Sequence, residues 1–260
     1  MQYKLLLFDL DGTLLRSDKT ISPKTREALA LCRDRGILIG VCTSRSEQKC
    51  LPILQAVNAD VVISSNGAMV KYRGQTIHRA LFSPEETAAL IHAARQLCGD
   101  SCEITVDTES CQYWNYKIDP SAADPTWGAS VYTDYTGFYE SAQKICVETA
   151  DEAAAARLAA AFPAYTCLRF SGTDWYQFTR QDATKETGIR VFCDHMGIPL
   201  SKVAAFGDDD PDIGMLKLCG TGIAMGNANE AVKAAADLVI GTNDEDGIAQ
   251  YLVHLFSREG

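Results

Sequence analysis

The feature that most constrains this chain is a repeated unit of a short apolar run, a polar loop and a helical segment. The runs 4–8, 37–41 and 61–63 each end abruptly in polar residues. Short, continuous apolar runs of this kind are typical of strands that are buried on both faces of a parallel sheet. Between the first two runs, Ser22 and Pro23 are expected to cap and open a helix. The pattern therefore predicts an α/β fold with helices on both faces of the sheet.

The α/β pattern is interrupted in the middle of the chain and resumes in the last third. A helical stretch at 84–98 precedes alternating segments that suit paired antiparallel strands. A similar helix-and-strand unit recurs after a loop-like stretch at 119–136. We therefore expect a discontinuous α/β core domain formed by 1–82 and 183–260, with a smaller α+β domain inserted over 83–182.

The 260-residue chain is acidic, with a formal net charge of −10 and a pI near 4.9. This balance argues against nucleic acid or an anionic membrane as the main partner, because both attract clustered Lys and Arg. The first residues lack the apolar core and cleavage site of a signal peptide, and no segment has the roughly 18 apolar residues that span a bilayer. We therefore expect a cytoplasmic protein whose 10 scattered cysteines are reduced thiols.

Two acidic clusters each follow an apolar run. Asp9 and Asp11 come directly after the first run, and Asp208–Asp210 with Asp212 follow the run 203–206. Ligands of parallel α/β sheets bind beyond the carboxyl ends of the strands, so we expect both clusters at one edge. Close carboxylates repel one another unless a cation or a proton separates them, and carboxylate oxygens suit Mg²⁺. A single Asp-x-Asp is more often a turn or a surface pair, but two clusters in one domain favour a magnesium site.

Short motifs follow one another in a definite order along the chain. They are Asp9-Leu10-Asp11-Gly12-Thr13, Thr43-Ser44-Arg45, Ser65-Asn66-Gly67-Ala68, Lys185, Gly207-Asp208 through Asp212, and Gly222 through Ala228. Together these motifs resemble the haloacid dehalogenase superfamily of phosphohydrolases, specifically its Cof-like branch, over almost the entire chain. The resemblance implies a Rossmann-like core domain whose insert is the larger α/β cap of this branch.

The resemblance implies a role for each motif. Asp9 would attack phosphorus and form an aspartyl phosphate, which splits hydrolysis into two displacements. Asp11 would protonate the leaving oxygen and later deprotonate water. Thr43 would donate hydrogen bonds to the phosphoryl oxygens, and Lys185 would neutralise charge shared by the phosphate and Asp9. Taken alone, Thr43 would be interpreted as a hydroxyl at a strand end, and Lys185 as a solvated lysine at a helix start.

The resemblance also implies which residues surround the phosphate and the metal. The phosphate would be bound by Asp9, Leu10, Thr43, Ser44, Asn66 and Lys185. Mg²⁺ would be held by Asp9, the backbone carbonyl of Asp11 and Asp208. Asp212 would support the metal site through water or by orienting Lys185.

Three positions depart from the usual pattern of this family. Pro211 stands where relatives usually carry Asn, and we expect Asp210 to be the N-cap with Pro211 at the first helical position. Ser44 replaces a Gly, which narrows the backbone freedom beside the phosphate. Glu186 follows Lys185 where Gly is usual, and its carboxylate is expected to compete with phosphate for that lysine.

The function implied is that of a magnesium-dependent phosphatase acting on a small phosphorylated metabolite, such as a sugar phosphate or a nucleotide. Two alternatives share the same motifs. One is a phosphomutase, which returns the phosphoryl group to a sugar. The other is a weakly active or non-catalytic protein that binds phosphorylated metabolites. A homodimer is left open.

Overall fold

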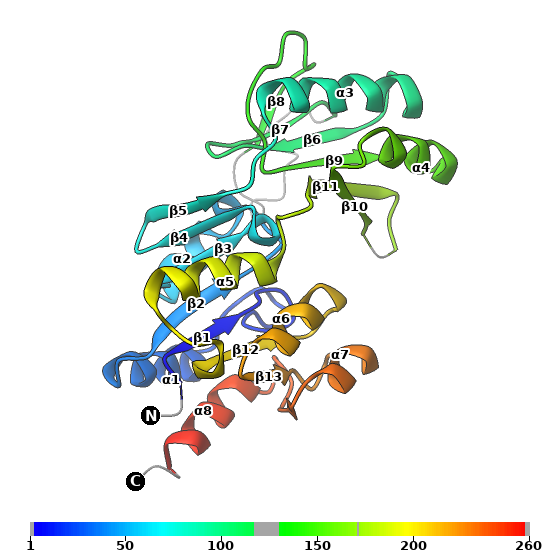
Figure 1. Ribbon diagram of the computed structural model, residues 1–260. Helices are drawn as coiled ribbons and strands as arrows, with labels where there is room; N and C mark the ends of the chain where they lie inside the picture. The colour runs from blue at the N-terminus through cyan, green and yellow to red at the C-terminus, as the bar shows by residue number, and fades with distance from the viewer. Residues whose placement is uncertain (1–2, 117–129, 171, 258–260) are drawn as a thin grey trace. The chain divides into compact units, whose positions relative to one another are not determined.

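The computed structural model describes residues 3–116, 130–170 and 172–257, which form two compact units (Figure 1). The first, called the core unit below, comprises Met1–Ser44, Leu51–His78 and Thr184–Gly260. The second, called the inserted unit, comprises Arg45–Cys50 and Arg79–Ala183.

The short segment Arg45–Cys50 groups with the inserted unit, although the sequence analysis places it in the first domain. The side chain of Gln48 shows why, because its Nε2 donates to the backbone carbonyl of Thr108 at 3.1 Å. The chain therefore contributes a piece of the inserted unit well before the main insert begins.

The core unit is built on a sheet whose eight strands, counted over the described residues, run in the order β14-β13-β12-β1-β2-β3-β4-β5. The strands are β1 (Leu5–Phe8), β2 (Leu38–Cys42), β3 (Val61–Ser64), β4 (Met69–Tyr72), β5 (Gln75–Arg79), β12 (Val203–Gly207), β13 (Thr221–Ala224) and β14 (Leu238–Val239). Strands β14 through β3 are parallel, and β4 is antiparallel to β3. Both central strands, β1 and β12, are buried along their whole length, as expected of strands covered on two faces.

Helices cover both faces of this sheet. They are α1 (Pro23–Asp34), α2 (Leu51–Ala56), α5 (Lys185–Met196), α6 (Ile213–Leu218), α7 (Glu230–Ala235) and α8 (Gly247–Ser257). Phe192 of α5, Met215 of α6 and Val232 of α7 share one apolar cluster with Ala205 of β12. The next residue of β12, Phe206, points to the opposite face and contacts Tyr251 of α8, with ring centroids 5.8 Å apart. Helix α8 also packs against α1.

A side-chain cap sets the first residue of α5. The Thr184 side chain accepts a hydrogen bond from the backbone N–H of Thr187 at 3.1 Å. Helix α5 ends at Met196, and the next residue, Gly197, has the left-handed conformation common after a helix. Capping by Thr184 therefore places Lys185 at the start of a helix that is anchored on the sheet.

The inserted unit is a sheet with two helices on one face. Over the described residues its six strands run in the order β10-β11-β9-β6-β7-β8. The elements are α3 (Pro84–Cys98), β6 (Ile104–Asp107), β7 (Gln112–Trp114), β8 (Ser130–Tyr132), β9 (Lys144–Glu148), α4 (Glu152–Ala161), β10 (Tyr165–Arg169) and β11 (Trp175–Arg180). Leu90 of α3 and Leu158 of α4 pack with Ile104, Val147 and Phe178 of the sheet in a separate apolar core.

The predicted α/β fold class is confirmed, and the structure corrects one local interpretation and adds one element that was not predicted. The stretch 119–136 is not all loop, because Ser130–Tyr132 pairs with β7 as a parallel strand, whereas the part of it up to residue 129 lies outside the described residues. The hairpin β4–β5, with Arg73 and Gly74 at its turn, adds an antiparallel edge that the sequence analysis did not predict. Each cysteine carries a free thiol, as predicted. Over the described ranges, every helix is too short or too polar to cross a membrane.

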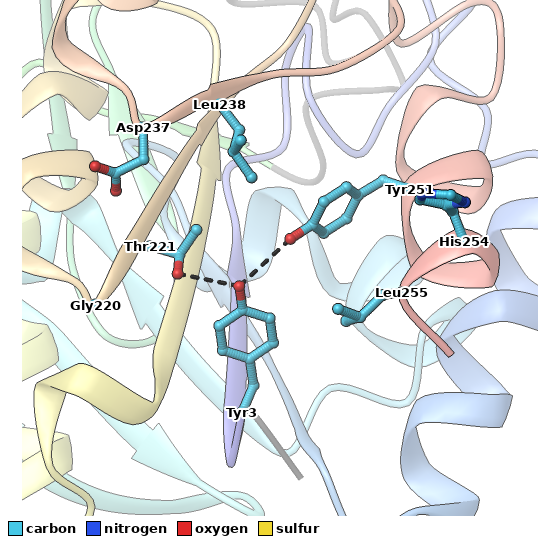
Figure 2. Close-up of a pocket in the computed structure, with 8 residues that line it drawn as sticks. All are labelled: Tyr3, Gly220, Thr221, Asp237, Leu238, Tyr251, His254 and Leu255. Carbon is cyan, nitrogen blue, oxygen red and sulfur yellow. Dashed lines mark hydrogen bonds between the residues drawn. The ribbon is translucent and has the colours of Figure 1, made fainter. Parts of the chain in front are cut away.

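A cavity of about 400 Å³ opens at the end of the core sheet where the strands begin. Figure 2 shows the Tyr3 hydroxyl between those of Thr221 and Tyr251, at 3.0 Å and 3.4 Å. Tyr3 precedes β1 and Thr221 opens β13, so this cavity lies at the opposite end of the strands from the acidic clusters. Ligands of parallel sheets bind at the carboxyl ends of the strands, so the edge that carries the acidic clusters is the candidate active site.

Candidate active site

Three neighbouring strand ends carry polar residues identified in the sequence. Asp9 follows β1, Thr43 follows β2 and Asp208 follows β12. Strand β1 lies between the other two and is parallel to both. The backbone N–H of Asp9 continues this pairing by donating to the carbonyl of Phe206 at 3.0 Å. The sheet thus brings residues from distant parts of the sequence to one edge.

Lys185 lies between two carboxylates at this edge. Its Nζ donates to Oδ1 of Asp9 at 2.7 Å and to Oδ1 of Asp212 at 2.6 Å, and its side chain is only 2% exposed. Burial by itself lowers the pKa of Lys185, but the charges of Asp212 and Asp9 outweigh burial and raise the pKa above its ordinary value. The ammonium therefore stays charged, and Lys185 is not a solvated surface lysine.

Asp212 ties Lys185 to the loop that follows β12. Its Oδ2 accepts hydrogen bonds from the backbone N–H groups of Asp208 at 2.9 Å and Asp209 at 3.2 Å. Because Lys185 occupies its Oδ1, both carboxylate oxygens of Asp212 are engaged by the protein. This geometry suits a residue that orients Lys185 and the loop of Asp208.

The turn that carries Asp212 begins one residue earlier than predicted. The structure has a single 3₁₀ turn at Asp210–Asp212, with Asp209 as its N-cap. The predicted N-cap at Asp210 is wrong because Asp209 and Asp212 form a reciprocal capping box, which satisfies donors at both positions. Pro211 lies in the first turn, where a missing N–H costs no hydrogen bond.

The carboxylates of this site carry more negative charge than Lys185 balances. Burial raises the pKa of Asp9 to about 8, with Lys185 lowering it and Asp212 raising it further. Burial also raises the pKa of Asp208 to about 6, against the effect of a hydrogen bond from Thr13. A divalent cation would favour the ionised form of these carboxyl groups and reverse the field that repels an anionic substrate.

The oxygen atoms at the site also fit a metal ion. One carboxylate oxygen from each of Asp9, Asp208 and Asp212 lies within 4.8 Å of the others. Oδ1 of Asp208 accepts from the Thr13 hydroxyl at 2.5 Å, and Oδ1 of Asp9 accepts from Lys185. Within the described part of the chain, Oδ2 of Asp9 and Oδ2 of Asp208 accept no hydrogen bond. Carboxylate oxygens arranged in this way suit Mg²⁺.

The side chain of Asp11 forms an exposed ion pair, and that of Leu10 is buried in the core. The Asp11 carboxylate pairs with Nζ of Lys19 at 2.8 Å, and the two side chains are 39% and 50% exposed. Exposed ion pairs are worth only about 0–1 kcal/mol, so this pair opens easily. The side chain of Leu10 is fully buried in the core, and a phosphate contact at this residue would use its backbone N–H.

Thr43, Ser44 and Asn66 are connected at the ends of β2 and β3. The N–H of Thr43 donates to the carbonyl of Ile63 at 2.8 Å, and its carbonyl accepts from the N–H of Asn66 at 3.1 Å. The Ser44 hydroxyl donates to Oδ1 of Asn66 at 2.6 Å. Because the backbone N–H of Thr43 is committed to the sheet, the phosphoryl contact expected of this residue falls to its hydroxyl.

Comparison with known proteins identifies the family of this chain. The haloacid dehalogenase-like hydrolase family matches residues 6–252, which is nearly the whole chain. This chain belongs to that family. The family membership predicted from the motifs is confirmed.

Individual relatives cover this hydrolase almost from end to end. It is 27% identical over 268 residues to 5-amino-6-(5-phospho-D-ribitylamino)uracil phosphatase YitU of Bacillus subtilis, with 97% of each chain covered. It is also 27% identical over 269 residues to pyridoxal phosphate phosphatase YbhA of Escherichia coli, covering 97% of this chain and 98% of the relative. A solved haloacid dehalogenase-like hydrolase from Bacteroides thetaiotaomicron is 26% identical with a TM-score of 0.85, covering 97% of this chain and 99% of that one. The hydrolase is therefore a phosphohydrolase, as predicted.

The Glu186 side chain of this hydrolase lies beside Gly214, and not beside Lys185 as predicted. A Cβ built on Gly214 would lie 1.5 Å from Oε1 of Glu186, so the carboxylate rests against the start of α6. Lys185 is instead occupied by Asp9 and Asp212. The expected competition of Glu186 with phosphate for Lys185 is wrong, because adjacent residues of a helix point in different directions.

Three further residues support the site and were not singled out by sequence reasoning. Thr13 hydrogen-bonds Asp208, Lys19 pairs with Asp11, and Asn227 donates from Nδ2 to the carbonyl of Gly12 at 2.8 Å. Thr13 and Asn227 lie inside motifs that were recognised, so their position in those motifs was the available signal. Lys19 had no such signal, because only the fold of the loop after β1 brings it to Asp11.

Gly12 lies directly against Asp208, and this contact gives a testable prediction. Its φ is +82°, and a Cβ would lie 2.1 Å from Oδ2 of Asp208. We expect Gly12→Ala to lower kcat/KM for phosphate release by about 100-fold or more, since displacing a site group by about 1 Å has effects of that size. The matched control is Gly74→Ala, because Gly74 has a φ of +81° but nothing within 4 Å of its Cβ position. Similar kinetic losses in the two variants would show that backbone strain, and not the contact with Asp208, is responsible.

Proposed function

We propose that this hydrolase is a magnesium-dependent phosphatase of small phosphorylated metabolites and that Asp9 is its nucleophile. The observation that carries the proposal is the buried ammonium of Lys185, 2.7 Å from Asp9 and 2.6 Å from Asp212. Phosphoryl transfer places charge on the phosphoryl oxygens, and a fixed cation beside the attacking carboxylate stabilises that charge. A buried lysine in this position suits a site in which the neighbouring carboxylate attacks phosphorus.

The reaction consists of two displacements at phosphorus. Asp9 forms a bond to phosphorus while the bond to the leaving oxygen breaks, which gives an aspartyl phosphate and an alcohol. Water then attacks the phosphorus, and phosphate leaves with Asp9 restored. Asp11 gives its proton to the leaving oxygen in the first step and takes one from water in the second. This role requires the exposed ion pair between Asp11 and Lys19 to open.

Asp9, Asp208 and the backbone carbonyl of Asp11 would hold Mg²⁺, and Asp212 would support them through its hydrogen bonds to Lys185 and to the loop of Asp208. When bound, the ion neutralises negative charge that the carboxylates and the substrate phosphate would otherwise share. Burial, with a further contribution from neighbouring carboxylates, raises the pKa values of Asp9 and Asp208, and a bound cation would favour their ionised forms.

The substrate class follows from the same chemistry. Relatives named for pyridoxal phosphate and for 5-amino-6-(5-phospho-D-ribitylamino)uracil act on phosphate monoesters of small metabolites. We infer that this hydrolase acts on the same class, which includes sugar phosphates and nucleotides. A net charge of −10 disfavours polyanionic nucleic acid as the substrate.

The proposal is tested by measuring phosphate release from a panel of phosphorylated metabolites and from 4-nitrophenyl phosphate. We expect release with Mg²⁺, its loss on chelation, and its return when Mg²⁺ is added again. Isomerised sugar phosphate without free phosphate would instead identify a phosphomutase. Tight binding without turnover across the panel would identify a phosphometabolite-binding protein.

A further inference from the structure

The turn after β3 has an unusual backbone. Ser65, Asn66 and Gly67 are consecutive residues with positive φ values of 50°, 57° and 96°. Left-handed conformations are costly for residues with a Cβ and are seldom found in succession. When such a conformation persists beside an active site, it commonly holds a side chain in position for function.

The surrounding structure holds this turn from two sides. The N–H of Asn66 donates to the carbonyl of Thr43 at 3.1 Å, which ties the turn to the end of β2. On the other side, a Cβ on Gly67 would lie 2.0 Å from the carbonyl oxygen of Thr184, the cap of α5. The turn therefore lies between the end of β2, where Thr43 is found, and the start of α5, where Lys185 is found.

The Ser44 hydroxyl sets the orientation of the Asn66 carboxamide. It donates to Oδ1 of Asn66 at 2.6 Å, which leaves the amide nitrogen on the other side of the carboxamide group. Among the described residues, no acceptor hydrogen-bonds Nδ2 of Asn66. A Gly at position 44 could not make this contact, so the orientation depends on the serine that this chain carries.

The position of Asn66 indicates which part of a substrate its Nδ2 meets. Asp9 follows β1, Thr43 follows β2 and Asn66 follows β3, in adjacent strands. Neighbouring strands are about 4.8 Å apart, so the ends of β3 and β1 are about 10 Å apart, with the end of β2 between them. A phosphoryl group bound at Asp9 and Thr43 fills the nearer part of this distance. With a phosphoryl group at Asp9 and Thr43, Asn66 would lie next along this edge of the sheet, beyond Thr43.

We propose that Ser44 and Asn66 form a specificity pair in which Ser44 positions Asn66 to donate from Nδ2 to an oxygen of the leaving group. This inference rests on the proposed phosphatase function and deepens it. The pair would favour phosphate monoesters of polyols and sugars, whose leaving groups carry hydroxyl or ether oxygens, over esters of plain alcohols and phenols. Such discrimination is expected because a site donor that is left unpaired by the wrong substrate has lost its solvent hydrogen bond.

The test compares substrates with and without leaving-group oxygens. kcat/KM is measured for glycerol 3-phosphate, pentose 5-phosphates and hexose 6-phosphates on one hand, and for propyl phosphate and 4-nitrophenyl phosphate on the other. In Asn66→Ala we expect the preference for the best hydroxylated substrate over propyl phosphate to fall by about 10-fold or more, the scale of one well-placed hydrogen bond. Ser44→Ala should lower the same ratio by a smaller factor, and Ser44→Thr, which keeps the hydroxyl, should restore it.

Inhibition by inorganic phosphate distinguishes a contact of Asn66 with the leaving group from a contact with the transferred phosphoryl group. If Nδ2 meets the leaving group, the inhibition constant of phosphate should change by less than about two-fold in Asn66→Ala, because phosphate has no leaving group. A rise comparable to the loss in kcat/KM would overturn the proposal and assign Asn66 to the phosphoryl group. An unchanged substrate ratio in Asn66→Ala would also overturn it.

Asn58→Ala is a matched control for replacing an asparagine that has a left-handed backbone. Asn58 has a φ of 46°, is exposed and precedes β3, whereas Asn66 follows the same strand. Asn58→Ala should therefore leave the substrate ratio unchanged. A wild-type protein that hydrolyses none of these esters would contradict the proposed function itself. Hydrolysis with a ratio that is insensitive to Asn66 would contradict only this inference.

Discussion

Asp9→Asn is expected to lower kcat for phosphate release by at least about 10⁴-fold, the scale of losses seen when an attacking nucleophile is removed. An amide cannot form the acyl phosphate that the carboxylate forms, although it has nearly the same shape. Wild-type protein should also yield a covalent phosphoryl adduct on Asp9 that is trapped by rapid acid quench and detected by mass spectrometry. Phosphate release at the wild-type rate from Asp9→Asn would disprove the assignment of the nucleophile.

The fold of this variant should survive, which separates chemistry from unfolding. Burial raises the pKa of Asp9 to about 8, so the ionised carboxylate is unfavourable at neutral pH in metal-free protein. Replacing it with a neutral amide relieves that cost, and we expect the Tm of metal-free Asp9→Asn to equal or exceed that of the wild type. A matched control is Asp18→Asn, because Asp18 lies in the same loop, is exposed, and accepts hydrogen bonds from Thr20 that an amide oxygen can keep.

Lys185→Met is expected to lower both stability and activity. Methionine keeps most of the side-chain volume, but Asp9 and Asp212 lose the ammonium that they share at 2.7 Å and 2.6 Å. Removing one partner of a buried ion pair costs about 3–5 kcal/mol, because the other charge is left without compensation. Loss of the fixed cation beside the phosphoryl group should in addition lower kcat by about 10²–10³-fold.

The stability loss is measured by chemical unfolding of metal-free protein, and the kinetic loss by phosphate release with saturating Mg²⁺. The control is Lys233→Met, since Lys233 pairs with a glutamate whose side chain is 93% exposed. Exposed pairs contribute at most about 1 kcal/mol, so this variant should resemble the wild type. Equal destabilisation by the two substitutions would show that Lys185 is not the centre of the charge arrangement described above.

Much of the fold follows from local signals in the sequence. The helix predicted at 84–98 is found as Pro84–Cys98, because a capping box between Ser83 and Glu86 opens it and Gly99 follows its end. The runs predicted as buried strands are found in β1, β2 and β3 because continuous apolar residues have few alternatives to a buried sheet. The short strand Ser130–Tyr132 was missed, since three residues carry too little pattern and their pairing with β7 supplies the structure.

The site, too, has features that the sequence predicts and features that it does not. The acidic clusters pointed to Asp9 and Asp208 from residue type and position, whereas Thr43 and Lys185 were predicted only because the order of the motifs resembles the family. The placement of Glu186 was not predictable, as it depends on the space that Gly214 leaves beside it. The same holds for the N-cap of the last acidic turn, where Asp209 and Asp210 are equally suitable by residue type and only the hydrogen bonds of Asp212 decide between them.

The sequence by itself determined the α/β class, the family and the two acidic strand ends, because these depend on periodicity and on residues adjacent in the chain. Only the tertiary structure decided that Lys185 is shared by Asp9 and Asp212, that Thr13 hydrogen-bonds Asp208, and that Ser44 orients Asn66. These contacts join residues from different strands and helices. Their geometry is set by the register of the sheet and the packing of α5 upon it, which local sequence does not encode.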